Sequence, residues 1–146
     1  MRPSRSRLLA TLAVAAGAVL VLAGCGSHAS VSTKPVESYK GEPKGVEAPA
    51  SSAGGAPWAV WMTKDGDEFA VVLYGSDKCP PKATGYKVTA PDEITIKVAK
   101  QADSCTDGYS PWTTVFDTPS NLDRYVHIQF TAQDTHFYLA PVKKKK

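Results

Sequence analysis

Residues 58–74 read WAVWMTKDGDEFAVVLY, and this stretch decides the fold. Apolar side chains alternate with other residues on both sides of Asp65-Gly66, a dipeptide typical of a two-residue hairpin turn. A turn at that dipeptide pairs Trp58 with Leu73 and places both on one apolar face. The turn chemistry and the apolar pattern therefore predict the same register, with Trp58 in the core.

Alternating apolar residues continue along the rest of the chain. A second hairpin is predicted around Ala90-Pro91-Asp92, and a further strand around Trp112–Phe116. A turn at Gln133-Asp134 pairs Phe130 with Phe137 and joins the last two strands. No segment shows the 3.6-residue period of an amphipathic helix. About seven short strands favour an all-β fold, either a small antiparallel β-sandwich or a partly open barrel.

The N-terminus has the pattern of an exported protein. Three arginines precede Leu8–Leu22, which is apolar and uncharged but too short and wrongly flanked for a secure membrane span. Leu22-Ala23-Gly24-Cys25 then resembles the lipobox of bacterial lipoproteins. The resemblance implies a diacylglyceryl thioether on Cys25 and removal of residues 1–24 as a signal peptide. The alternative is an ordinary secretory signal with a chance cysteine.

The lipid on Cys25 would anchor the mature chain at the extracytoplasmic face of the cell membrane, and two acyl chains give stable anchoring where one is marginal. Residues 25–56 are expected to be the lipidated cysteine and a disordered linker. Gly26–Pro57 is rich in Ser, Ala, Gly and Pro and has no hydrophobic period. It therefore cannot bury enough apolar surface to offset the entropy that it would lose on folding. The folded domain is expected over residues 57–142, with a basic tail over residues 143–146.

The two cysteines left in the mature chain flank the second predicted hairpin. Cys79 precedes it and Cys105 follows it, so both lie at its open end. Exported proteins fold in an oxidising compartment, and we therefore expect a Cys79–Cys105 disulfide. A metal site is the rival interpretation, but the two cysteines lack a CxxC spacing and nearby histidines.

The cysteine-containing loops carry a second resemblance. Gly75-Ser-Asp-Lys-Cys-Pro-Pro81, Ser104-Cys-Thr106 and Ser110-Pro-Trp-Thr-Thr-Val115 are similar to segments of small secreted lipoproteins of high-GC Gram-positive bacteria. The similarity covers residues 70–118 at most. It implies a related fold and no particular activity.

The chain shows no catalytic constellation, and we expect no enzyme activity, no cofactor and no metal. His127 and His136 lie about four residues apart along the predicted ribbon, roughly 13 Å, which is too far to share a metal. No Gly-x-Ser-x-Gly elbow occurs. Asp65-Gly-Asp-Glu68 lacks the further ligands of a calcium loop. Hairpin tips also rarely supply the cleft that paired glycosidase carboxylates need.

Four aromatic and histidine side chains are candidates for a ligand face, because their positions alternate with the predicted core. They are Trp61, Tyr74, His127 and Tyr138. Exposed aromatics of this kind could stack on a glycan or a peptide. The alternative is that some strands are apolar on both faces because the fold is compact.

Charge excludes a nucleic-acid-binding domain. The chain has 17 Lys and Arg against 14 Asp and Glu, and three arginines lie in the signal peptide, so the mature chain is neutral. The lysines at 143–146 form a run that is usually just solvated, and the alternative is contact with anionic lipid or wall polymer.

By elimination, the leading hypothesis is a monomeric, non-catalytic binding or accessory module at the cell envelope. Its partner would be wall glycan, a peptide or an envelope protein. The alternatives are a small hydrolase of envelope polymers and a structural spacer without a ligand. This ranking rests on analogy between folds.

The lipobox generates the first prediction. Replacing Cys25→Ser removes the only thiol positioned to accept lipid, so the variant should lose labelling by a palmitate analogue and should leave the membrane fraction. Labelling and fractionation in the native host measure both effects, with Ser27→Ala as a control that keeps both. A Cys25→Ser chain that remained acylated and membrane-bound would contradict the assignment.

Overall fold

The structure is a computed structural model, and it describes residues 32–102, 104–105 and 108–144. The predicted signal peptide, Cys25 and the last two lysines lie outside these residues. Within them, no helix is long and apolar enough to cross a membrane. The elements in chain order are β1 (Glu37–Lys40), the short 3-10 helix η1 (Ala50–Ser52), β2 (Trp58–Trp61), β3 (Glu68–Gly75), β4 (Ala83–Ala90), β5 (Glu93–Val98), β6 (Ser110–Asp117), β7 (Ile128–Ala132) and β8 (Thr135–Leu139).

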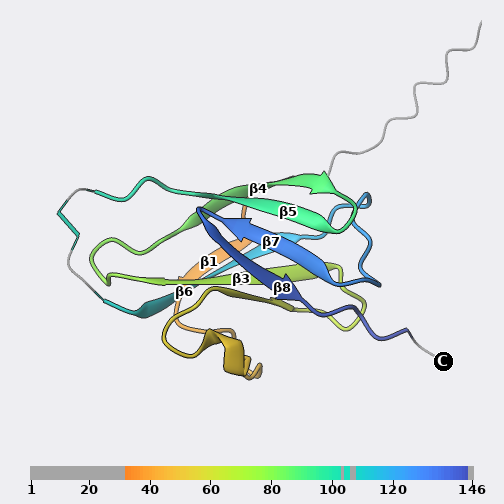
Figure 1. Cartoon of the computed structure of the whole chain (residues 1–146), viewed down its shortest axis with the longest axis horizontal. Helices are drawn as coiled ribbons and strands as arrows, with labels where there is room; N and C mark the ends of the chain where they lie inside the picture. The colour runs from red at the N-terminus through yellow and green to blue at the C-terminus, as the bar shows by residue number, and fades with distance from the viewer. Residues whose placement is uncertain (1–31, 103, 106–107, 145–146) are drawn as a thin grey trace, which may run out of the picture.

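The strands form two four-stranded sheets that enclose the core (Figure 1). Sheet A has the order β1-β6-β3-β2, and sheet B has the order β4-β5-β7-β8. The predicted all-β sandwich with one disulfide is confirmed. The expectation of a purely antiparallel fold is wrong at one pair, because β5 and β7 run parallel. Between them the chain crosses to sheet A as β6 and returns, which allows β7 to run in the direction of β5.

Four aromatic rings hold the two sheets together. Phe69 lies at their centre, with ring centroids 5.5 Å from Tyr86, 5.6 Å from Phe116 and 5.4 Å from Phe130. None of the four side chains is more than 1% exposed. The Tyr86 hydroxyl donates to the Asp117 carbonyl at 2.9 Å, so its polar end is satisfied. Such ring pairs each contribute about 0.5–1.5 kcal/mol beyond the area that they bury.

The predicted register of the first hairpin is wrong by one residue. Trp58 pairs with Val72, not Leu73, and Trp61 pairs with Phe69. The cause is the loop between the strands. Thr63 accepts the Gly66 N–H on its carbonyl and the Asp67 N–H on its hydroxyl, which makes a longer loop than a two-residue turn. A one-residue shift of β2 against β3 moves every side chain of β2 to the other face of the sheet. Trp61 therefore faces sheet B, and Trp58 faces away from it.

The centre of the outer face of sheet A is buried. Val72 and Thr113 are inaccessible to solvent and Trp58 is 2% exposed, although all three point away from sheet B. The segment that covers them is residues 41–57, which we call the strap. η1 belongs to the strap and lies outside the two sheets (Figure 1).

The prediction of a disordered linker up to residue 56 is therefore wrong. Glu37–Lys40 forms β1, an additional strand that pairs with β6. The strap is then fixed by polar contacts: Thr113 donates to the Gly41 carbonyl at 2.6 Å, and Tyr74 donates to the Glu42 carboxylate at 2.6 Å. Composition failed to reveal this segment because it is held by hydrogen bonds and small side chains and carries few large apolar residues.

The second predicted hairpin is present as β4 and β5, in which Tyr86 pairs with Ile96. The predicted pairing of the last two strands is confirmed, since Phe130 pairs with Phe137 across β7 and β8. The Cys79–Cys105 disulfide is also confirmed, with a sequence separation of 26 residues. On the chain-entropy argument, closing such a loop stabilises the fold by about 3–4 kcal/mol.

Tyr86 makes the free energy of unfolding decrease as the pH rises through the alkaline range. Burial, together with the nearby Asp117 charge, raises its pKa from 10.0 to about 12. Its contribution to the free energy of unfolding is therefore fully present below the unfolded pKa near 10 and is lost as the pH rises toward 12. Tyr86→Phe should lose about 1 kcal/mol at neutral pH, since the hydrogen bond to Asp117 is gone, and should show a shallower alkaline decline.

Urea unfolding of the wild type and of Tyr86→Phe across this pH range measures both effects. Tyr39 and Tyr74, whose pKa values burial also raises, keep part of the decline in the variant. An unchanged alkaline slope in Tyr86→Phe would contradict the assignment.

Candidate functional site

The four residues of the predicted ligand face lie on different surfaces. Trp61 points between the sheets and donates its indole N–H to the Ala140 carbonyl at 2.7 Å. Tyr74 lies beneath the strap. Tyr138 is 62% exposed on the outer face of sheet B, and its hydroxyl donates to Gln129 at 3.2 Å. His127 is exposed just before β7. The structure does not bring these side chains into one platform.

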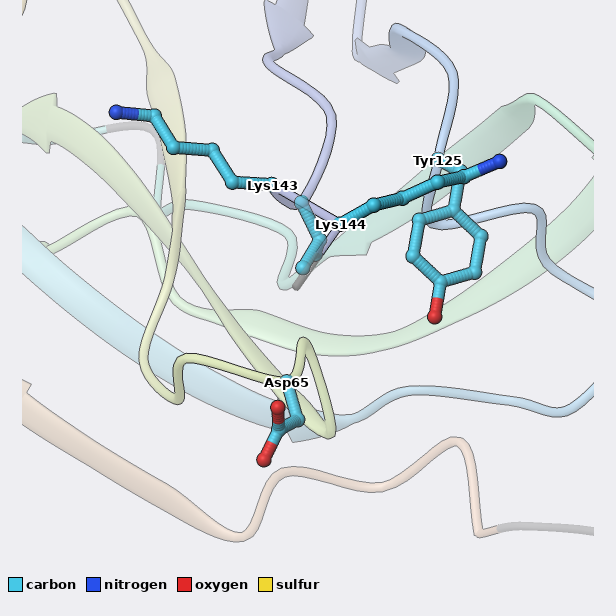
Figure 2. A pocket seen from close by; sticks show the side chains of 5 residues that line it. Asp65, Tyr125, Lys143 and Lys144 are labelled. Carbon is cyan, nitrogen blue, oxygen red and sulfur yellow. The ribbon is translucent and has the colours of Figure 1, made fainter. Parts of the chain in front are cut away.

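The C-terminal end of the chain lines a pocket at one end of the sandwich. Its volume is about 420 Å³, and Asp65, Tyr125, Val142, Lys143 and Lys144 surround it. Figure 2 shows Lys144 beside the Tyr125 ring and Asp65 on the hairpin loop across the pocket. The Lys144 ammonium lies 5.1 Å from the centre of that ring, within the range of a cation–π contact.

The opposite end of the sandwich carries three adjoining pockets, which we call the end groove. The largest, about 570 Å³, shares Tyr74, Pro81 and Gln133 with a second of about 200 Å³. The second shares Pro57 and Thr135 with a third of about 210 Å³ beside β8. The shared residues place the three pockets side by side along this end of the sandwich.

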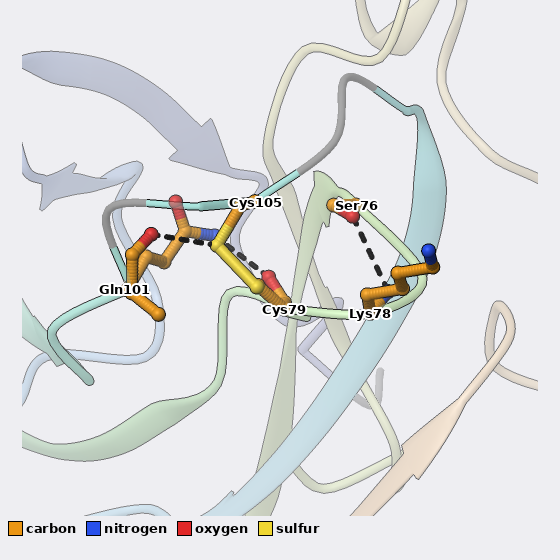
Figure 3. The surroundings of a disulfide bond; sticks show 6 residues. Ser76, Lys78, Cys79, Gln101 and Cys105 are labelled. Atoms are coloured by element: carbon orange, nitrogen blue, oxygen red, sulfur yellow. Dashed lines mark hydrogen bonds between the residues drawn. A yellow bond between two sulfur atoms is a disulfide. The ribbon is translucent and has the colours of Figure 1, made fainter.

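The disulfide forms part of the groove's largest pocket. Cys105 and Gln101 both line it, and the Gln101 amide donates to the Cys79 carbonyl at 2.9 Å (Figure 3). Gln133 lies across the pocket at the β7–β8 turn, where its φ is +54°. Two side-chain amides therefore reach the same pocket from segments far apart in sequence.

Tyr109, just before β6, supplies an aromatic wall of the groove, and Gly55 of the strap lies against its ring. Gly55 has a φ of +83°, and a Cβ at this position would lie 2.5 Å from Cδ1 of Tyr109. The Tyr109 ring rests against this glycine and is 76% exposed. Only glycine combines this backbone conformation with so close an approach. The sequence therefore places Gly55 where Tyr109 can lie along the groove.

Tyr74 fixes the strap from beneath the groove. Its hydroxyl accepts the Trp58 indole N–H at 3.1 Å and donates to the Glu42 carboxylate. Burial, together with the hydrogen bond to Glu42, raises the pKa of Tyr74 above its ordinary value. Tyr74 therefore stays a protonated donor at neutral pH, and its role is to position the strap.

The described lining of the groove carries no permanently charged side chain. Among its described lining residues there is no Lys, Arg, Asp or Glu, and His136 ends the groove beside β8. The part of the chain that the structure describes also contains no group of three His, Cys, Asp or Glu side chains that could hold a metal ion. The arrangement offers aromatic rings and amides, which suit a ligand without net charge.

Comparison of the chain with protein-family models, with curated proteins and with solved structures gives no match. The site is therefore interpreted from its own geometry. Sequence patterns had missed Tyr109, Gln101, Gln133 and the strap. The adjacent Gly54-Gly55 was the available signal, since paired glycines mark a tight turn that ordered chain must make.

The two glycines of the strap provide a matched test of the Tyr109 contact. Both have positive φ, but a Cβ at Gly54 meets nothing within 4 Å, whereas one at Gly55 meets Tyr109. Gly54→Ala and Gly55→Ala should each cost about 1–2 kcal/mol of stability for the backbone conformation. Only Gly55→Ala should shift the Tyr109 ring resonances in NMR spectra, because the ring must move aside. Equal ring shifts in both variants would contradict the contact.

Proposed function

We propose that this chain is an exported, lipid-anchored and non-catalytic binding module of the cell envelope, and that its end groove holds an extended, uncharged envelope glycan. The observation that carries the proposal is the groove's described lining, which has no Lys, Arg, Asp or Glu and lies beside the exposed Tyr109 ring. The lipid anchor rests on the lipobox resemblance at Cys25.

Glycan suits this lining for two reasons. A sugar ring presents C–H groups that pack on an aromatic face, and Tyr109 offers such a face at 76% exposure. Sugar hydroxyls and N-acetyl groups need hydrogen-bond partners, and Gln101 and Gln133 provide amides in the same pocket. A strongly anionic or cationic polymer would find no opposite charge among the described lining residues.

A hydrolase is a weaker reading of the same groove. Its nearest candidate base, His136, shares a hydrogen bond of 2.9 Å between its Nδ1 and the Thr131 hydroxyl. Acid–base catalysis by a glycosidase needs two carboxyl groups flanking the bond to be cleaved. Among the described residues that line the groove, none carries a carboxylate.

The direction of β1 supports an outward-facing groove. Glu37 pairs with Val115 near the end of β6, whereas the groove lies near Gly75, which pairs with Ser110 at the start of β6. β1 therefore begins at the end opposite the groove. A lipid on Cys25 would then leave the groove pointing away from the membrane and toward wall polymer.

Two exposed tyrosines at opposite ends of the sandwich test the proposal. With the mature chain carrying Cys25→Ser, N-acetylglucosamine oligomers, which carry no charge, should bind saturably and change the fluorescence of Trp58, which lines the groove. Tyr109→Ala should weaken binding about tenfold, the loss typical of removing an aromatic anchor. Tyr125→Ala, which removes a 50% exposed ring at the other end, should leave binding unchanged.

The proposal fails if the wild-type chain does not bind, since the remaining candidate would be a spacer. It also fails if Tyr109→Ala and Tyr125→Ala weaken binding equally. Release of shortened glycan products by the wild type would support the hydrolase.

A further inference from the structure

The C-terminal segment after β8 is docked onto the sandwich at three points. Ala140 accepts the Trp61 indole N–H, and the Val142 N–H donates to the Arg124 carbonyl at 2.8 Å. Val142 is only 9% exposed and packs on Gly66, where a Cβ would lie 2.6 Å from its Cγ2. These contacts fix where the following lysines emerge.

The lysines emerge beside exposed apolar side chains. Tyr125 is 50% exposed and Val126 is 39% exposed, and the Lys144 ammonium lies over the Tyr125 ring. Lys143 lines the same pocket, and two further lysines follow in the sequence. An aromatic ring with lysines around it is the combination found at membrane–water interfaces, where the ring enters the headgroup region and the ammonium groups meet lipid phosphates.

We propose that Tyr125, Val126, Lys143 and Lys144 form a contact surface for anionic phospholipid headgroups, which we call the lipid-facing patch. The patch lies at the end of the sandwich where β1 begins, because Val142 packs on the loop that precedes Glu68, and Glu68 pairs with Asp117 at the end of β6. The inference rests on the proposed lipid anchor at Cys25, which would hold this end at the membrane.

Acidic side chains near the patch weaken its attraction to anionic headgroups. Asp67 is paired with Arg124 at 2.7 Å, Asp123 accepts the Tyr125 N–H, and Asp65 lines the pocket. The patch therefore provides a weak, salt-sensitive attraction. A weak attraction is sufficient to orient a domain that a tether already keeps near the surface, since the tether supplies a high effective concentration. The patch would turn the end groove away from the bilayer.

The test uses the mature chain with Cys25→Ser, so that no lipid contributes. Vesicles of phosphatidylcholine containing phosphatidylglycerol should co-sediment the protein at low salt, and pure phosphatidylcholine vesicles should not. Lys143→Gln/Lys144→Gln should weaken binding about tenfold or more, because each lysine near an anionic surface contributes separately. Lys87→Gln/Lys97→Gln removes the same charge from the outer face of sheet B and should leave binding unchanged.

Equal loss in the two double variants would overturn the patch, because net charge alone would then explain binding. Absence of a preference for phosphatidylglycerol would overturn it as well. So would full displacement by inorganic phosphate at matched ionic strength, which would indicate a site for a small anion. Palmitate labelling of unmodified Cys25 is scored separately, so loss of the anchor and loss of the patch are distinguishable outcomes.

Discussion

The structure depends on one constraint, the burial of β3 on both of its faces. Phe69 and Val71 point to sheet B, whereas Ala70 and Val72 point the other way, and all four are inaccessible to solvent. A two-layer sandwich covers only the inner face of each sheet, so the outer face of sheet A needs a further cover. The strap provides part of that cover. Its contacts through Glu42 and Gly41 follow from this requirement.

The same requirement connects the fold with the proposed binding site. The strap reaches β2 through Gly55 and Pro57, and both residues line the end groove. Tyr109 can lie along the groove because Gly55 has no side chain. A segment that first serves to bury the outer face of sheet A therefore also forms one wall of the groove. Under the proposed function, changes that loosen the strap would therefore affect both stability and binding.

Much of the fold could be predicted from sequence because the signals were local. The alternation around Gln133-Asp134 gave the correct pairing of Phe130 with Phe137, and the two mature-chain cysteines gave the disulfide. The register around Asp65-Gly66 could not be predicted, because the Thr63 hydroxyl and carbonyl organise a longer loop. The groove could not be predicted either. Its residues come from the strap, the disulfide loop and the β7–β8 turn, and only the folded chain brings them together.

The central claim is that the end groove, and not a sheet face, binds uncharged envelope glycan. The most direct measurement is an NMR titration of the mature chain with glycan fragments, following backbone and side-chain amide resonances. If the groove binds the glycan, saturable shifts should concentrate at Gly55, Gln101, Gly108 and Gln133, with none at Lys87 or Lys97 on the outer face of sheet B. Shifts confined to that outer face, or no shifts at all, would contradict it.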